Sequence, residues 1–159
     1  MEGMAFPYKI RMAYQNEWED AMALAWKTFL EFEADDYAPE GIRSFEDFIT
    51  DSTLHRMFIM GAYQMFVALD GSRMAGMITV RGNSHISLLF VDKEYHRRGI
   101  GRALMEGLCG YLRTELNIRR VTVNAAPFGT GFYHRLGFKD LKPEQMSSGI
   151  RYTPMELFL

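Results

Sequence analysis

The order of apolar and polar residues predicts a chain that mixes strands with helices. Apolar residues recur at helical spacing in segments that predict helices over residues 16–32, 44–49, 100–112 and 129–136. Short apolar runs bounded by turn residues predict strands over residues 8–13, 63–69, 74–80, 86–91, 120–124 and 150–159. Successive antiparallel strands that lead into a strand–helix unit are typical of an α+β or mixed α/β domain.

Capping residues and a proline refine these elements. Asn16, with Glu19 three residues later, resembles a capping box that would begin the first helix. Ser44 is the expected cap of the second helix. Pro154 cannot donate to a β-ladder, so it indicates that the last strand lies at an edge or contains a bulge.

The junction between the strand that ends at Val91 and the helix that begins at Ile100 predicts an anion site. The first N–H groups of a helix have no partner within it, and the helix dipole adds a partial positive charge there. Glycines stand at positions 99 and 101, and the same turn carries Arg97, Arg98 and Arg102. Guanidinium groups bind phosphate with two hydrogen bonds, so a diphosphate is a better candidate than a carboxylate. An ordinary strand-to-helix turn with solvated arginines is the alternative.

Two common phosphate-binding motifs do not match this junction. A Walker loop needs Lys and then Ser or Thr after its last glycine, whereas Gly101 is followed by Arg102 and Ala103. A dinucleotide fingerprint needs a small residue where Leu104 stands, and no acidic residue ends the strand near Val123.

The junction resembles the acetyl-CoA loop of the GNAT acetyltransferase superfamily, which is usually written [QR]-x-x-G-x-[GA]. Here the loop reads His96-Arg97-Arg98-Gly99-Ile100-Gly101, with His96 at the first position and Lys93 where a proline is common. A second segment, Gly131-Phe132-Tyr133-His134-Arg135-Leu136-Gly137-Phe138, follows the strand at 120–124 and resembles the F-Y-x-x-x-G-F ending of the same superfamily.

The resemblance implies a fold and a set of roles. The fold would be GNAT-like, with a central, mostly antiparallel sheet of six to seven strands flanked by helices. Acetyl-CoA would be the cosubstrate, no metal would be needed, and an amine would attack the thioester without a covalent enzyme intermediate. The main chain of Leu89, Phe90 and Val91 would pair with the pantetheine arm, and Asn124 would bond to that arm or to a water. The pyrophosphate would be held by His96, Arg97, Arg98, Gly99, Ile100, Gly101 and Arg102.

Tyr133 would lie at the sulfur atom. A phenol has a pKa of about 10 and a thiol of about 8.5, so full proton transfer to the thiolate is uphill by about 2 kcal/mol. We therefore expect Tyr133 to act by donating a hydrogen bond. A packed aromatic ring is its alternative role.

Two residues are candidates for the general base. Strict alternation along the strand at 86–91 would place His85, Ser87, Leu89 and Val91 on one face, and GNAT enzymes often carry a base near the start of this strand, so His85 is the first candidate. Glu33 is the second, within an acidic cluster of Glu31, Glu33, Asp35 and Asp36. This cluster is either a solvated helix end or a collar that attracts a cationic amine.

Composition narrows the class of protein. The 159 residues have a formal net charge of −2, which argues against a nucleic-acid binder. No apolar run is long enough to span a membrane, residues 1–13 lack the core of a signal peptide, and the single cysteine, Cys109, allows no internal disulfide. We expect one domain over residues 1–159, a cytoplasmic location and, as in many GNAT proteins, a possible homodimer.

Three functions are consistent with these residues. The first is an N-acetyltransferase acting on a small-molecule or peptidyl amine, possibly a cationic one. The second is a non-catalytic acyl-CoA sensor, which would not need a phenol at the sulfur. The third is acetylation of a protein partner such as a ribosomal N-terminus. The identity of the acceptor is left open at this point.

Overall fold

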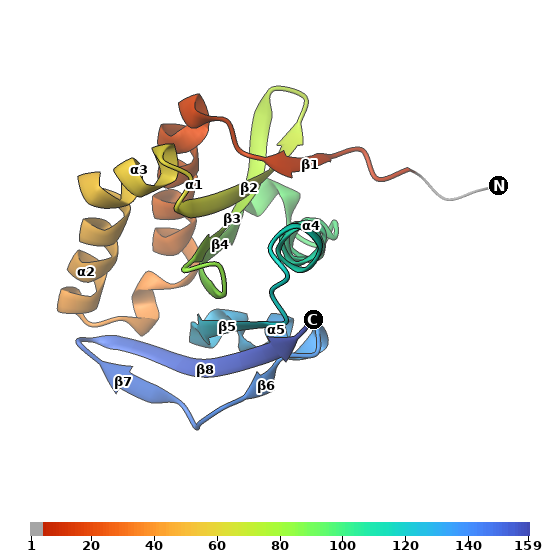
Figure 1. Ribbon diagram of the computed structural model, residues 1–159. Helices are drawn as coiled ribbons and strands as arrows, with labels where there is room; N and C mark the ends of the chain where they lie inside the picture. Colours follow the sequence, from red (N-terminus) through yellow and green to blue (C-terminus); the bar gives the residue numbers. More distant parts are fainter. Residues whose placement is uncertain (1–4) are drawn as a thin grey trace.

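The computed structural model describes residues 5–159, and a twisted sheet runs through their centre (Figure 1). Eight strands form it: β1 Lys9–Met12, β2 Tyr63–Asp70, β3 Arg73–Arg81, β4 His85–Val91, β5 Arg120–Ala125, β6 Lys139–Asp140, β7 Gln145–Ser147 and β8 Ile150–Phe158. Their order is β1-β2-β3-β4-β5-β8-β6, with β7 also paired to β8. All pairs are antiparallel except β4 with β5. The mostly antiparallel α/β fold is confirmed, but six to seven strands was too few, because β6 and β7 are too short to show a pattern.

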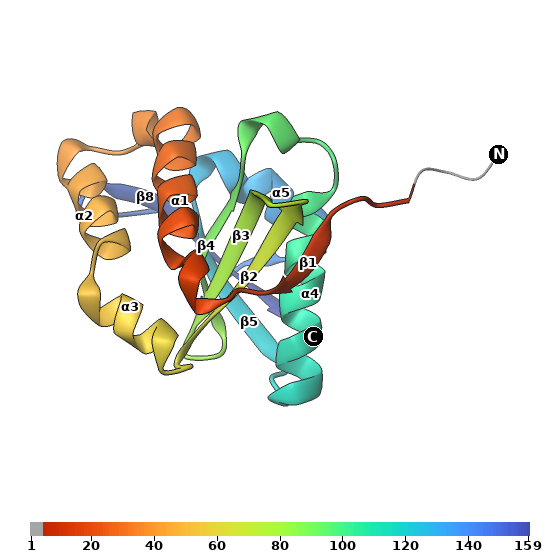
Figure 2. The same ribbon diagram turned by 90° about the horizontal axis from the view of Figure 1, so that it is seen from above.

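Helices cover both faces of the sheet, and each face has its own apolar core (Figure 2). α1 (Trp18–Phe32), α2 (Pro39–Ile49) and α3 (Ser52–Ile59) pack on one face around Trp18, Phe29 and Phe58. α4 (Ile100–Glu115) and α5 (Thr130–Arg135) pack on the other face around Leu104, Leu108 and Tyr133. No helix within residues 5–159 is both long and apolar enough to cross a membrane.

The first helix begins differently from the prediction. A 3-10 turn over Gln15–Glu17 precedes α1, so Asn16 lies inside this turn and does not cap the helix. The carboxylate of Glu17 accepts a hydrogen bond from the N–H of Tyr14 at 2.7 Å and forms an ion pair with Arg11 at 2.8 Å. Glu17, which is held by Arg11 and by the N–H of Tyr14, therefore fixes the start of the 3-10 turn that leads into α1.

The second helix also begins earlier than predicted. α2 starts at Pro39, a residue favoured at the first helical position, so Ser44 is an exposed interior residue and not a cap. The sequence pattern does not predict α3, which begins at Ser52 after the N-cap residue Asp51. The side chain of Asp51 accepts a hydrogen bond from the N–H of Thr53 at 2.7 Å. The eight residues of α3 are too few for a clear helical period.

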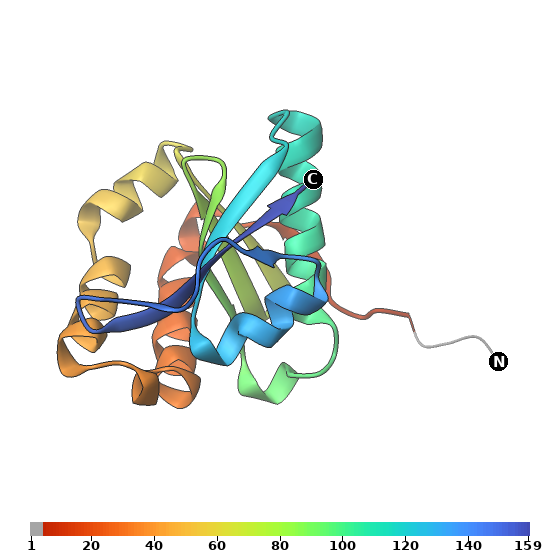
Figure 3. The ribbon, with the colours of Figure 1, turned by 90° about the horizontal axis from the view of Figure 1, so that it is seen from below.

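The interpretation of Pro154 as an edge residue is wrong, because β8 lies between β5 and the short strands β6 and β7 (Figure 3). The carbonyl of Pro154 accepts the N–H of Leu141 at 2.8 Å, so its imino nitrogen faces the same side of the strand. β6 pairs with residues 155–156 and β7 with residues 150–152. Pro154, which has no N–H, therefore lies in the gap between the β6 and β7 pairings, where no strand pairs with the outer side of β8.

A β-bulge at Ser87 changes the faces of β4. Thr79 of β3 pairs with Leu88, and the next residue, Val80, pairs with Ile86, so Ser87 is an extra residue in the ladder. Its hydroxyl bonds to Tyr63 at 2.5 Å and to Thr79 at 2.8 Å. Strict alternation is therefore wrong for this strand: Ser87, Leu88 and Phe90 face α1–α3, whereas Leu89, Val91 and Ile86 face α4.

Candidate active site

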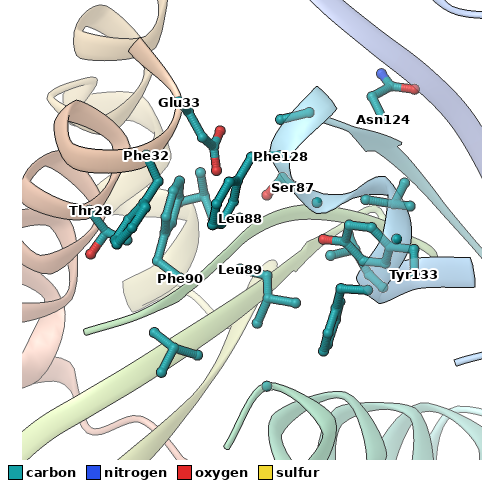
Figure 4. A pocket seen from close by; sticks show the side chains of 18 of the residues that line it. Thr28, Phe32, Glu33, Ser87, Leu88, Leu89, Phe90, Asn124, Phe128 and Tyr133 are labelled. Carbon is teal, nitrogen blue, oxygen red and sulfur yellow. The ribbon is translucent and has the colours of Figure 1, made fainter. Parts of the chain in front are cut away.

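β4 and β5 separate beyond the bulge. They pair only at His85 with Thr122 and at Ile86 with Val123, after which β5 continues alongside β8. A cavity of about 1010 Å³ opens at this separation and is walled by α1, α2, β4, β5 and the first residues of α4 and α5. Figure 4 shows the side chains that surround it. All but one of the predicted site residues line it, namely Glu33, His85, Leu89, Phe90, Val91, His96, Arg97, Gly99, Ile100, Gly101, Arg102, Asn124 and Tyr133.

The main chain of β4 offers hydrogen-bonding groups to the gap. The N–H of Asp92 bonds to the carbonyl of Ala75 at 2.8 Å, and the register places Phe90 opposite Met77. Because such groups alternate in an antiparallel pair, those of Phe90 face β3 and those of Leu89 and Val91 face the gap. The expected main-chain role of Phe90 is thus wrong, since its N–H and C=O belong to the β3 ladder.

The turn before α4 leaves several N–H groups free of helical partners. Arg97 and Gly99 have positive φ angles of 64° and 80°, and the first helical hydrogen bond runs from Ala103 N–H to Gly99 C=O at 3.0 Å. The N–H groups of residues 100–102 therefore precede the helical ladder, as expected at a helix N-terminus. Glycine is needed at positions 99 and 101 for different reasons. A Cβ at position 99 would meet no atom within 4 Å, so its φ angle demands glycine, whereas a Cβ at position 101 would lie 3.0 Å from the ring of Phe132.

The basic side chains of the turn point in different directions. Arg97 and Arg102 are exposed and line the cavity. Arg98 does not line it: its guanidinium donates to the hydroxyl of Tyr8 at 2.9 Å and lies 5.3 Å from the centre of the Tyr95 ring. The prediction that Arg98 holds the pyrophosphate is therefore at odds with its position, because its charge is turned toward the N-terminal segment.

His96 also has a different position from the one that its motif implies. Its Nε2 lies 2.7 Å from the carbonyl oxygen of Val91, and its N–H bonds to the carbonyl of Lys93 at 3.3 Å. Its ring packs against Phe32 of α1, with 4.9 Å between the ring centres. Because its Nε2 and its main-chain N–H are both bonded within the protein, His96 supports the turn and does not offer a free donor to an anion.

The buried carboxylate of Asp92, directly after β4, holds the turn before α4 in place. Asp92 accepts hydrogen bonds from the N–H of Glu94 at 3.0 Å and from Lys27 at 3.2 Å, and Arg73 lies 3.5 Å away. Burial acts to raise the pKa of Asp92, but these donors outweigh it and hold the pKa below its usual value. The sequence analysis missed this anchor, because Lys27 and Arg73 are far from Asp92 along the chain.

Tyr133 presents a free phenol to the cavity. Its ring is buried between Phe132 and Phe138, each with 5.3 Å between ring centres. Its hydroxyl forms no hydrogen bond with any side or main chain of residues 5–159 and points into the cavity in Figure 4. Burial, and then the nearby charge of Glu33, raise the pKa of Tyr133. The phenol therefore stays protonated and can donate a hydrogen bond.

Glu33 faces the same space from the end of α1 (Figure 4). Burial, with a smaller contribution from Asp36, raises the pKa of its carboxyl from 4.5 to about 7. The rest of the acidic cluster stands apart: Glu31 and Asp35 are exposed, and Asp36 lies 3.6 Å from Arg151. Among these four residues, only Glu33 brings a carboxylate to the cavity wall.

His85, the first residue of β4, also lines the cavity. Its Nδ1 lies 2.8 Å from the hydroxyl of Thr122 on β5, and burial, with the nearby charge of Arg81, lowers its pKa. At neutral pH the ring is therefore uncharged. Asn124, further along β5, is exposed at the cavity edge.

Aromatic rings form much of the remaining wall, and the sequence analysis assigned none of them to the site apart from the main chain of Phe90. They come from α1, the segment after it, α2, β4, the turn before α4, the 3-10 turn before α5, and α5, and are Phe32, Tyr37, Phe45, Phe48, Phe90, Tyr95, Phe128 and Phe132. Their helical spacing could only indicate an apolar face, because the partner of that face is set by the tertiary fold.

Comparisons with known proteins agree with this geometry. Residues 33–159 match a family model described as an acetyltransferase (GNAT) domain. The chain is 34% identical over 83 residues to the uncharacterized N-acetyltransferase YafP of Escherichia coli, a match that spans 52% of this chain and 51% of that protein. A GCN5-related N-acetyltransferase from Rhodopseudomonas palustris superposes with a TM-score of 0.82 at 21% identity, covering 100% of this chain and 99% of the other. The PaiA N-acetyltransferase of Thermoplasma acidophilum, solved in complex with coenzyme A, gives 0.80 at 19% identity, covering 96% and 99%.

Proposed function

The chain belongs to the GNAT acetyltransferase family, and on this premise we propose that it transfers the acetyl group of acetyl-CoA directly to a primary amine. The observation that carries the proposal is the meeting of Glu33 and Tyr133 in one cavity at the separation of β4 and β5. A half-buried carboxyl with a raised pKa and a buried phenol supply the base and the acid that acyl transfer to an amine requires.

The residues around the separated strands fit acetyl-CoA. The N–H groups of residues 100–102, together with Arg97 and Arg102, would hold the diphosphate. The main-chain groups of Leu89 and the N–H of Val91, which face the gap, would pair with the pantetheine amides in the manner of an added strand, while the carbonyl of Val91 is bonded to His96. The thioester of this cosubstrate supplies the activated acyl group. The coenzyme A complex of PaiA, which shares the fold, supports this assignment.

Glu33 is the better candidate for the base. Its pKa of about 7 lets it accept a proton at neutral pH, and its charge influences Tyr133, the residue proposed to lie at the sulfur. Deprotonating an amine with a pKa near 10.4 at pH 7 costs about 4–5 kcal/mol, so a carboxylate beside the ammonium is needed. His85 already shares its Nδ1 with Thr122 and lies beside Arg81, whose charge opposes an approaching ammonium.

Tyr133 would donate a hydrogen bond to the sulfur as the bond to the acetyl group breaks. Its raised pKa makes complete proton transfer more costly than for a free phenol, so hydrogen bonding is its principal contribution. The sole cysteine, Cys109, lies on α4 outside the cavity, and burial raises its pKa to about 11. Direct transfer to the amine therefore fits this chain better than a cysteine acyl-enzyme.

Thiol release from acetyl-CoA with a panel of primary amines tests the proposal, alongside calorimetry of coenzyme A binding. We expect binding of coenzyme A and amine-dependent thiol release that falls in Glu33→Gln and Tyr133→Phe. Arg113→Met, an exposed substitution on α4 far from the cavity wall, serves as the matched control. Binding without thiol release for any amine would favour the acyl-CoA sensor, and absence of binding would overturn the proposal.

A further inference from the structure

Among the described residues, Arg81 brings an unpaired positive charge to the cavity wall. Arg81 ends β3, pairs across the ladder with His85, and lines the cavity. Its guanidinium forms no ion pair and no side-chain hydrogen bond with residues 5–159. Glu33 is the sole carboxylate along the described wall, so nothing in that wall neutralises Arg81.

The two charges act on different groups of the cavity wall. The charge of Glu33 raises the pKa of Tyr37 and of Tyr133, whereas the charge of Arg81 acts on His85 and Tyr63. Leu88 and His85 of β4 both line the cavity, and the register places them opposite Thr79 and Arg81 of β3. These two partners are two residues apart on their strand, which corresponds to roughly 7 Å.

The same wall also carries apolar side chains and one engaged hydroxyl. α2 contributes Phe45 and Phe48, and β4 contributes Leu88. Ser87 also lines this stretch, but its hydroxyl is already bonded to Tyr63 and Thr79. A molecule bound in the cavity would therefore find a carboxylate, aromatic and aliphatic surface, and a guanidinium within the same wall.

We propose that the acceptor is a primary amine whose apolar body ends in a carboxylate, and that Arg81 binds this carboxylate. The inference rests on the proposed function and deepens it. The acceptor's ammonium would meet Glu33 at the thioester, its alkyl or aromatic part would lie against Phe45, Phe48 and Leu88, and its carboxylate would form a bidentate pair with Arg81. A polycation such as a polyamine would instead place a positive group beside Arg81, which disfavours it.

Calorimetry on the protein saturated with coenzyme A tests this binding independently of catalysis. The probes are 4-(aminomethyl)benzoate and benzylamine, which differ only in the carboxylate, with spermidine as a polycationic comparison. We expect the wild-type protein to bind the carboxylate-bearing amine at least about tenfold more tightly than benzylamine. In Arg81→Met the ratio of the two affinities should fall close to one, and Arg81→Lys should restore part of it. Arg113→Met should keep the wild-type ratio.

The same pair of amines in the thiol-release assay separates the two proposals. A higher kcat/KM for 4-(aminomethyl)benzoate than for benzylamine, lost in Arg81→Met, would support the assignment. Equal affinities for the two amines, or an affinity ratio that Arg81→Met leaves unchanged, would overturn it even if amine-dependent thiol release is robust. Preference for spermidine would overturn it as well. Carboxylate-dependent binding without any thiol release would instead contradict catalysis while supporting the role of Arg81.

Discussion

Replacing Glu33 with glutamine should make the protein more stable at alkaline pH while removing its base. Burial raises the pKa of this carboxyl from 4.5 to about 7, so the folded chain binds a proton at Glu33 over a pH range in which the unfolded chain has already lost it. The stability of the wild-type protein therefore falls as the pH rises from 4.5 to 7. Glutamine has nearly the same shape and no charge, so it avoids this loss.

The magnitude follows from the size of the pKa change. At 1.36 kcal/mol for each pH unit, the ionised carboxylate costs about 3 kcal/mol at pH 8 and less than about 1 kcal/mol at pH 5. Urea titrations followed by circular dichroism at the two pH values would measure the free energy of unfolding for wild type and Glu33→Gln. The exposed Glu31→Gln, two residues earlier on α1, is the matched control and should behave like wild type.

Both outcomes of that comparison are informative about the cavity. A gain for Glu33→Gln at pH 8 that shrinks at pH 5, together with a loss of about 100-fold or more in kcat/KM, would identify a destabilising group retained for catalysis. If wild type and Glu33→Gln lose the same stability between pH 5 and pH 8, the carboxyl is not held in a low-dielectric site and the reasoning fails.

Three further results are expected. Tyr133→Phe should lower kcat by about 10- to 100-fold with little change in the KM for acetyl-CoA, because it removes only the hydroxyl; an unchanged kcat in steady-state thiol release would contradict this. The pH–rate profile of kcat/KM should rise with an apparent pKa near 7 as Glu33 ionises, and an acidic limb that persists in Glu33→Gln would assign it to another group. Asp92→Asn should lower the free energy of unfolding at pH 7 by about 2 kcal/mol, since it weakens the bonds to Lys27 and the N–H of Glu94. Because the pKa of Asp92 is lowered in the folded state, that difference should shrink as the pH falls below 3.8 toward the folded pKa, which urea titrations at pH 7 and pH 3 would detect.

Much of the fold could be predicted because it depends on local patterns. The strand into Val91, the glycine at 99 and the helix from Ile100 are adjacent in sequence, so their spacing alone indicated a strand, a turn and a helix N-terminus. The family that this spacing suggested is confirmed by the match over residues 33–159. The roles of the individual site residues stay predictions.

The rest depends on partners that are distant along the chain. Arg98 is turned away from the cavity by Tyr8, which lies 90 residues earlier, and no local pattern reports such a contact. Glu33 replaces His85 as the first candidate for the general base for a similar reason. The pKa of each group is set by burial and by charges on other elements, which the sequence does not show. The faces of β4 could not be derived either, since the bulge is defined by pairing with β3.

Because of the bulge at Ser87, the opening between β4 and β5 depends on the number of residues in β4 and not on the chemistry of its side chains. Deleting Ser87 would remove the residue that has no partner on β3, so the two strands would pair one residue to one, and we expect the bend that precedes the opening toward β5 to be lost. Exchanging the residue for alanine or threonine would keep the count and, with it, the opening. In β4, the deletion of one residue should therefore change the structure of the site more than almost any substitution would.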